Sequence, residues 1–153
     1  MEKNKKNFIS KDVTDLTQLQ WFPYQNSKLS IWHRPKTAHL FLLKSLYNLT
    51  HLITLQSERE NLEDLQKACV ANGITWVHIP LEGANLPLLQ RKESKKKLTQ
   101  GLKQVSEVLK ADEGHTILIH CAAGIHRTGV FTYSLFRILG YVIFFFPERI
   151  YLK

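Results

Sequence analysis

A cysteine and an arginine stand at the two ends of a short segment in the last third of the chain. Cys121 opens the segment and Arg127 closes it, with five residues between them. A thiolate is a strong nucleophile, and a guanidinium presents a planar fork of donors that matches the oxygens of a phosphate group. These two residue types could therefore perform nucleophilic chemistry on a phosphate if the fold brings them together, and the residues around them decide whether it does.

The residues on either side predict how this segment is held. An apolar run over 116–119 precedes it, and apolar residues recur at helical spacing from Val130 to Leu139. The sequence thus predicts a strand, a tight loop and a helix. The start of such a helix attracts anions and lowers the pKa of a cysteine beside it. The alternative is a buried structural cysteine next to a helix-capping turn.

The segment from His120 to Gly129 resembles the active-site loop of the cysteine-dependent protein tyrosine and dual-specificity phosphatases. It reads His-Cys, five residues including Gly124, and then Arg-Thr-Gly. The resemblance implies that Cys121 attacks phosphorus and that Thr128 hydrogen-bonds the sulfur and helps it to leave. The residues expected to bind the substrate phosphate are Ala122, Ala123, Gly124, Ile125, His126 and Arg127.

Two histidines of this segment have plainer alternatives. The resemblance implies that His120 orders the loop by hydrogen bonding, but it is equally a packed histidine at the end of a strand. His126 can add positive charge near the substrate when protonated. More simply, it is an exposed loop residue whose backbone binds the phosphate.

A phosphatase of this kind also needs an acid that protonates the leaving oxygen. In the family this is usually an aspartate in the loop after the preceding strand, which corresponds to residues 80–90 here. Glu82 is the only carboxylate in that stretch. A glutamate can transfer the same proton if its longer side chain fits, so Glu82 is the candidate acid. The alternative is a solvent-facing glutamate without a catalytic role.

Strand-like and helix-like segments alternate along the rest of the chain. Strands are predicted at 29–32, 52–55, 74–79 and 116–119, with helices from about Thr37, after the capping-box pattern Ser57 to Glu60, and over 92–111. This order predicts a single α/β domain with a central, mostly parallel twisted sheet flanked by helices, as in compact dual-specificity phosphatases. Ligands of such sheets bind beyond the carboxyl ends of the strands, where Cys121 falls.

We divide the chain into three parts. Residues 1–26 are predicted to be an N-terminal extension that packs on the domain, 27–140 the phosphatase domain, and 141–153 an atypical short C-terminal tail. In the tail, an apolar run over 141–146 is followed by Pro147, where relatives continue into a further amphipathic helix. This departure predicts weaker support for the catalytic loop.

The composition favours a soluble intracellular protein, cytoplasmic or nuclear. Two cysteines do not make a disulfide framework, and the charged start of the chain leads into no long apolar stretch. Cys69 lies on an apolar helical face with Leu62 and Leu65, which favours core burial over a disulfide with Cys121. The net charge of +8 favours anionic partners in general. We expect no cofactor, no metal site and no nucleic-acid partner, and we leave the oligomeric state open.

The resemblance implies a hydrolase that removes phosphate from proteins through a phosphocysteine intermediate. Phosphotyrosine is the expected substrate, with phosphoserine and phosphothreonine possible in addition. Ala122, Ala123 and Ile125 are uncharged, so the loop lacks the basic residues of relatives that act on inositol phospholipids. The alternative function is a pseudophosphatase, a module that binds phosphoproteins but hardly turns them over. A sulfur-transfer domain fits the Arg-Thr-Gly ending poorly.

Overall fold

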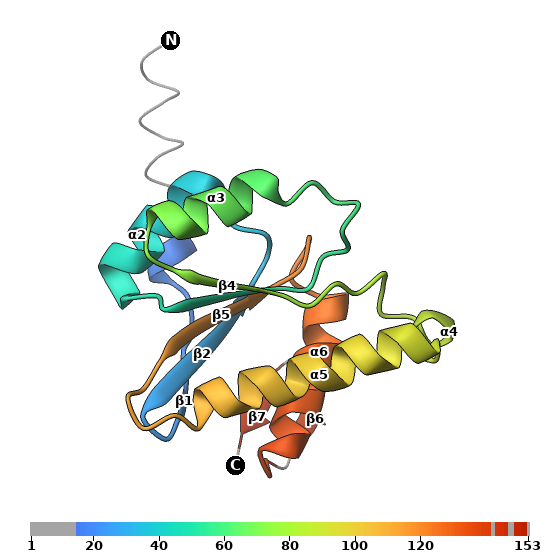
Figure 1. Cartoon of the computed structure of the whole chain (residues 1–153). Coiled ribbons are helices and arrows are strands. Elements are labelled where there is room, and N and C mark those ends of the chain that lie inside the picture. The colour runs from blue at the N-terminus through green and yellow to red at the C-terminus, as the bar shows by residue number, and fades with distance from the viewer. Residues whose placement is uncertain (1–14, 142, 147–148, 153) are drawn as a thin grey trace.

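A five-stranded sheet forms the centre of the computed structural model, which describes residues 15–141, 143–146 and 149–152 (Figure 1). The strand order is β1-β2-β5-β3-β4, and β1 runs antiparallel to β2 while the other pairs are parallel. The strands are β1 (Phe22–Tyr24), β2 (Ser27–Trp32), β3 (His51–Thr54), β4 (Thr75–His78) and β5 (Thr116–His120). The predicted single α/β domain with a mostly parallel sheet is confirmed.

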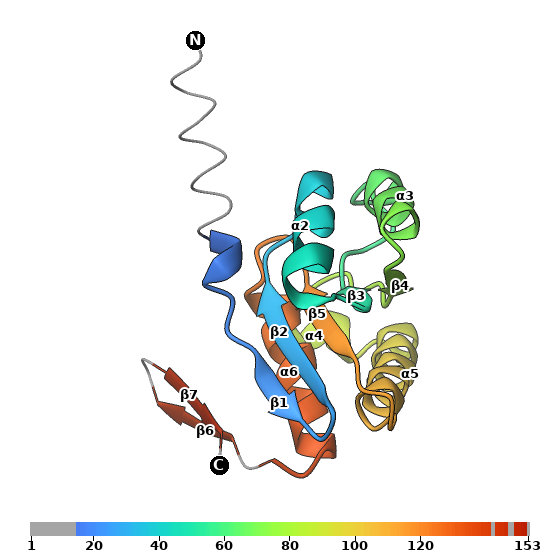
Figure 2. The same ribbon diagram turned by 90° about the vertical axis from the view of Figure 1, so that its left-hand side faces the viewer.

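Helices cover both faces of this sheet. They are α2 (Thr37–Tyr47), α3 (Glu63–Ala71), the single turn α4 (Leu86–Leu89), α5 (Lys92–Leu109) and α6 (His126–Ile138). Figures 1 and 2 show α2 and α3 on one side of the sheet and α5 and α6 on the other. A separate antiparallel pair, β6 (Ile143–Phe146) and β7 (Arg149–Leu152), follows α6.

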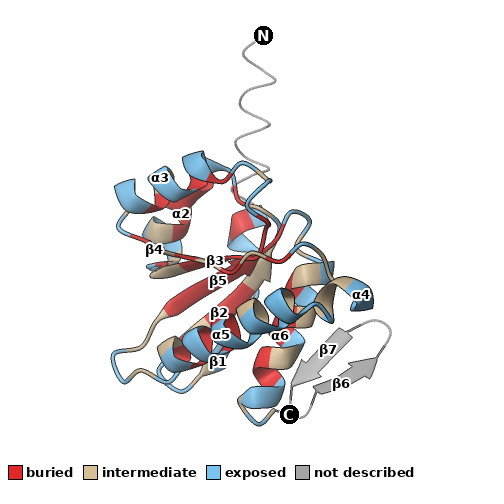
Figure 3. Ribbon diagram, turned by 45° about the vertical axis from the view of Figure 1, so that its right-hand side comes forward, coloured by how far each residue is buried: buried red, intermediate tan, exposed pale blue. Residues whose placement is uncertain are grey.

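The two faces of the sheet receive alternate residues of the central strands. In β5, Ile117 and Ile119 pack in the core under α5 and α6, whereas Leu118 packs in the core under α2 and α3. In β3, Ile53 and Leu52 divide in the same way. All five residues of β5 are buried, as is typical of a parallel strand covered on both sides (Figure 3). Cys121 therefore directly follows the carboxyl end of a central strand that is packed firmly on both faces.

Two local features differ from the sequence patterns. Phe22–Tyr24 forms a strand at the edge of the sheet, which the sequence patterns did not predict (Figure 2). The proline at its centre argues against a strand, because Pro23 lacks an N–H donor and is tolerated only at a sheet edge. The capping-box pattern at Ser57 does not begin a helix, since α3 begins at Glu63. The carboxylate of Glu60 accepts from the Ser57 N–H at 2.6 Å, as in a capping box, but the same oxygen also accepts from Arg127.

Within the described residues, no helix has the length and apolar character needed to cross a membrane. The described part of the chain also contains no group of three side chains suited to holding a metal ion. The division at residues 26 and 140 stays a prediction.

Candidate active site

The segment of residues 121–127, here called the phosphate loop, curls between the end of β5 and the start of α6. Residues 122–125 bend, and α6 begins at His126. Cys121 lies at the base of the curl and is only 3% exposed, whereas Ala122, Ala123 and His126 are exposed. Backbone N–H groups of Gly124 and others therefore surround the sulfur.

Gly124 is the one position in the phosphate loop where the backbone itself requires glycine. Its φ is +71°, and a Cβ placed there would come within 2.3 Å of the Trp32 carbonyl oxygen. The end of β2 is thus packed directly against the phosphate loop. Any larger residue would strain the backbone and force the two segments apart.

The Cys121 thiol is more acidic than an ordinary cysteine. Burial alone would raise its pKa, but hydrogen bonds to the sulfur outweigh burial and lower the pKa below its usual value. The Thr128 hydroxyl donates to Sγ at 3.1 Å, and the backbone N–H groups of Thr128, Gly124 and Ile125 also donate. These donors favour the thiolate, which is the nucleophilic form.

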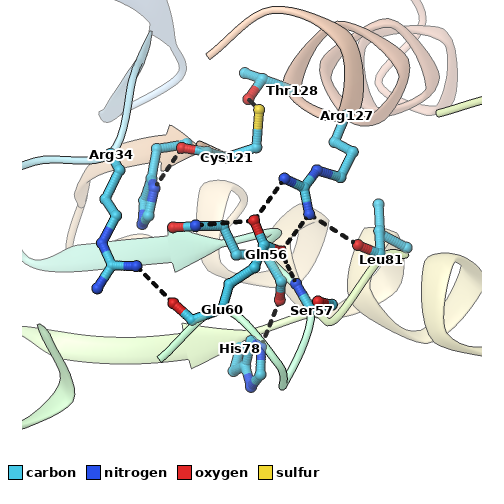
Figure 4. A network of polar contacts seen from close by, with 10 residues as sticks. Arg34, Gln56, Ser57, Glu60, His78, Leu81, Cys121, Arg127 and Thr128 are labelled. Carbon is cyan, nitrogen blue, oxygen red and sulfur yellow. Dashed lines mark hydrogen bonds and ion pairs between the residues drawn. The ribbon is translucent and has the colours of Figure 1, made fainter. Parts of the chain in front are cut away.

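Arg127 is held by a glutamate from a distant turn. Its Nη1 donates to Glu60 Oε2 at 2.6 Å and its Nη2 to Glu60 Oε1 at 2.9 Å, while Nη1 also donates to the Leu81 carbonyl at 3.1 Å (Figure 4). Arg127 lowers the pKa of Glu60 to about 2, helped by Gln56 and the Ser57 N–H against the effect of burial. The pair is largely buried, with the side chains 14% and 27% exposed.

The hydrogen bonds of Arg127 to Glu60 and Leu81 leave the donors on one edge of its guanidinium available for a ligand. Glu60 and Leu81 occupy both hydrogens of Nη1 and one of Nη2. The remaining edge consists of Nε–H and the second Nη2–H, which point in parallel and match two oxygens of a phosphate. The pKa of Arg127 is raised mainly by its hydrogen bonds to Glu60, and to a smaller extent by the charge of Cys121 and a hydrogen bond to it, so the guanidinium also interacts with the sulfur.

A directed chain of hydrogen bonds supports the base of the loop. The Trp76 Nε1–H donates to Thr54 Oγ1 at 2.9 Å, which leaves the Thr54 hydroxyl to donate to His120 Nε2 at 2.7 Å. His120 Nδ1 in turn donates to the Cys121 carbonyl at 3.1 Å. Burial lowers the pKa of His120 to about 4, so the ring is neutral at neutral pH and in the tautomer that this chain requires. His120 is both a packed strand residue and a partner of the loop.

Glu82 lies one residue beyond the Leu81 carbonyl that accepts from Arg127. Leu81 is buried and Glu82 is exposed. The predicted loop over 80–90 contains the single turn α4, where the Asn85 side chain accepts from the Leu88 N–H at 3.0 Å. The start of this loop is thus hydrogen-bonded to Arg127 through the Leu81 carbonyl, and the candidate acid is the next residue along the chain.

Cys69 is buried, as its place on an apolar face predicts. It packs in the core under α2 and α3, whereas Cys121 belongs to the core on the opposite face of the sheet. Burial raises the pKa of Cys69 to about 12, and both cysteines are free. Cys69 therefore acts as an apolar packing residue.

Sequence reasoning missed Glu60 as a site residue. Its place in a Ser-x-x-Glu pattern explained it as a helix cap, whereas the structure brings its carboxylate to Arg127. The one available signal was a carboxylate just beyond the end of a buried parallel strand, at the edge where Cys121 was expected.

Comparison with known proteins agrees with this geometry. The profile of the tyrosine phosphatase family matches residues 32–142. A search of curated proteins found no match. A putative phosphatase (DUF442) from Shewanella putrefaciens CN-32 has a similar structure, with a TM-score of 0.60 and 21% identity over 84% of this chain and 78% of that one.

Two further solved structures share the fold. The core catalytic domain of the PP-IP phosphatase SIW14 from S. cerevisiae has a TM-score of 0.54 and 20% identity, covering 80% of this chain and 67% of its own. The PTP-2 phosphatase of Cydia pomonella has a TM-score of 0.54 and 13% identity, covering 88% and 98%. The predicted resemblance to cysteine-based tyrosine phosphatases is confirmed: this chain belongs to the tyrosine phosphatase family.

Proposed function

We propose that the chain hydrolyses phosphate monoesters through a phosphocysteine intermediate on Cys121. The observation that supports this most directly is a sulfur of lowered pKa facing a guanidinium whose other edge is bound by Glu60. The thiolate attacks phosphorus in line, the new S–P bond forms and the bond to the leaving oxygen breaks. Water then attacks the phosphocysteine, which releases phosphate and restores the thiolate.

The phosphate loop stabilises the charge of both transition states. The side edge of Arg127 and the backbone N–H groups of the loop bind the non-bridging oxygens. Because Glu60 already fixes the guanidinium, little reorganisation is needed when charge develops. The Thr128 hydroxyl donates to the sulfur and makes it a better leaving group in the second step.

We assign the general acid to Glu82. It protonates the leaving oxygen in the first step and takes a proton from the attacking water in the second. Two observations support the assignment: the Glu60 carboxylate is already bound to Arg127, and Glu82 directly follows the residue whose carbonyl accepts from Arg127.

The preferred substrate class is phosphotyrosine in proteins. The exposed residues of the loop are mostly uncharged, and Ile125 is 62% exposed. An apolar rim favours an aromatic leaving group over a densely charged one. SIW14, a relative by fold, is named a PP-IP phosphatase, so phosphorylated small molecules are the competing class.

A second candidate function is a phosphoprotein-binding module with little turnover. It is favoured by the exposure of Glu82, which contrasts with the firmly held phosphate loop. A site that binds phosphate tightly but protonates the leaving group poorly would capture phosphopeptides.

The test measures hydrolysis of para-nitrophenyl phosphate, a phosphotyrosine peptide, a phosphoserine peptide and an inositol pyrophosphate, with Cys121→Ser as control. We expect the phosphotyrosine peptide to have the highest kcat/KM and rapid quenching to yield phosphate bound to Cys121. Phosphopeptide binding without hydrolysis would instead support the binding module. A preference for the pyrophosphate would refute the protein substrate class.

A further inference from the structure

We propose that Arg34 is a positioning residue that couples the phosphate loop to the turn that carries Glu60. This turn comprises residues 57–61 and is called the Glu60 turn below. The proposal deepens the proposed function and rests on it, since it concerns how Arg127 is aimed at the phosphate.

Arg34 contacts two separate parts of the site at once. Its backbone N–H donates to the Ala122 carbonyl in the phosphate loop at 3.0 Å. Its guanidinium donates through Nη1 to the Glu60 carbonyl at 2.9 Å (Figure 4). Its Nη2 donates to the Asn61 carbonyl at 2.7 Å. One residue therefore spans the phosphate loop and the Glu60 turn.

The place of Arg34 is set by its neighbours along the chain. The Trp32 carbonyl packs so closely on Gly124 that only glycine fits there. Pro35 is buried, and a residue that precedes proline is restricted to extended backbone. The backbone of Arg34 is thus held beside the phosphate loop, and its side chain extends to the Glu60 turn.

The Glu60 turn needs such a partner because it has little regular structure of its own. The Glu60 N–H donates to the Ser57 carbonyl at 3.2 Å, and the next residue, Asn61, has a φ of +49°. That conformation is uncommon outside glycine, although asparagine tolerates it. Two consecutive carbonyls of this turn accept from the fork of Arg34, which fixes the peptide unit that follows the Glu60 Cα and the next one along the chain.

Two successive sets of hydrogen bonds connect Arg34 to Arg127, the residue proposed to bind the phosphate. Glu60 is fixed by Arg34 through its carbonyl, and Glu60 fixes Arg127 through its carboxylate. In the part of the chain that the structure describes, Arg34 makes no hydrogen bond to Arg127 or to the Cys121 sulfur. Loss of the Arg34 side chain should therefore make the orientation of the Arg127 guanidinium less fixed. The groups that donate hydrogen bonds to the Cys121 sulfur should stay in place.

A double-mutant cycle between Arg34 and Glu60 tests this coupling. The measured quantity is the dissociation constant of tungstate, a tetrahedral dianion, by calorimetry with the full chain. We expect Arg34→Met and Glu60→Gln each to weaken binding about 10-fold, because each removes hydrogen bonds to charged groups. The double variant should bind tungstate almost as tightly as Glu60→Gln alone, because Arg34 acts on Arg127 through Glu60 and has nothing left to act through when Glu60 is replaced.

Two matched variants separate geometry from charge. Arg34→Lys keeps the charge but has a single donor centre that cannot replace the planar fork, so we expect it to recover less than half of the loss on a logarithmic scale. Arg59→Met removes a cation from the exposed side of the same turn and should change binding less than about twofold. If Arg34→Met does not fold, the cycle is run with Arg34→Lys.

Three results would overturn the proposal: additive losses in the double variant, wild-type binding by Arg34→Lys, or a shifted pH profile of Cys121 alkylation in Arg34→Lys. Binding and alkylation are measured without turnover. A wild-type chain that binds tungstate but hydrolyses nothing would refute the proposed function, while a non-additive cycle in that chain would still support the role of Arg34.

Discussion

The phosphate loop and the loop over residues 80–90 lie at the same edge of the sheet but are held very differently. The first is braced by a buried histidine chain, by Thr128 and by the Glu60–Arg127 pair. The second is tied to the site by the Leu81 carbonyl, and Glu82 directly after it is exposed. In the proposed mechanism, the groups that bind the phosphate are therefore held in place before it arrives, whereas delivery of the proton depends on an exposed side chain. This contrast predicts that binding and turnover respond differently to mutation.

The largest effect is expected at the nucleophile. Cys121→Ser should lower kcat for para-nitrophenyl phosphate by about 10³-fold or more, because a serine hydroxyl in this site is not ionised. Tungstate binding should stay equal or become tighter, since the anion no longer meets a thiolate. Steady-state kinetics and calorimetry on the same preparation check both halves, and loss of tungstate binding would contradict a preformed cradle.

The next effect tests the loop over 80–90. Glu82→Gln should lower kcat about 10²-fold for an alkyl phosphate, which needs a proton on its leaving oxygen. The loss should be much smaller for para-nitrophenyl phosphate, whose leaving group is stable as an anion. The control is Glu58→Gln, an exposed glutamate in the Glu60 turn. Equal losses on both substrates would remove Glu82 from the role of acid.

A smaller effect is expected at the sulfur. Thr128→Val removes the hydroxyl that donates to Sγ, so the pKa of Cys121 should rise and kcat should fall about 10-fold. The rate of alkylation by iodoacetamide against pH gives the change in pKa. Thr128→Ser keeps the hydroxyl and should behave like the wild type. An unchanged alkylation profile in Thr128→Val would show that the backbone N–H groups suffice.

The Glu60–Arg127 pair should also appear in acid stability. The pKa of Glu60 is about 2 in the folded chain, below its ordinary 4.5, so the folded chain binds fewer protons between these values. The stabilisation is complete above about pH 4.5 and is lost as the pH falls towards 2. Because solvent screens this partly exposed pair, we expect it to contribute about 1–2 kcal/mol at pH 7.

Urea unfolding of the wild type and Glu60→Gln between pH 7 and pH 3 measures this contribution. The difference in free energy of unfolding between the two should shrink as the pH falls. Glu58→Gln should instead give a nearly constant and small difference, because its carboxylate is exposed. A Glu60→Gln difference that does not depend on pH would contradict a lowered pKa of Glu60 in the folded chain.

Much of the fold could be read from local patterns. The strands β2 to β5 and the helices α2, α3, α5 and α6 follow apolar periodicities that each lie within one segment, and their predicted order is confirmed. The edge strand β1 was missed because it contains a proline, and α4 was missed because it is a single turn. In both cases the pairing or capping that stabilises the element does not appear as a periodic pattern.

The residues proposed to react with and bind the phosphate could be predicted from a single stretch of sequence. The candidate nucleophile, the proposed phosphate ligands, the required glycine and Thr128 all lie within eight consecutive residues, and local strand–loop–helix geometry is enough to bring them together. Which groups hold that loop in place could be seen only in the folded chain. Glu60, Arg34, Thr54 and Trp76 come from other strands and turns, and their roles depend on which parallel strands end side by side. No local spacing records that arrangement, because it arises from the order in which the strands pair in the sheet.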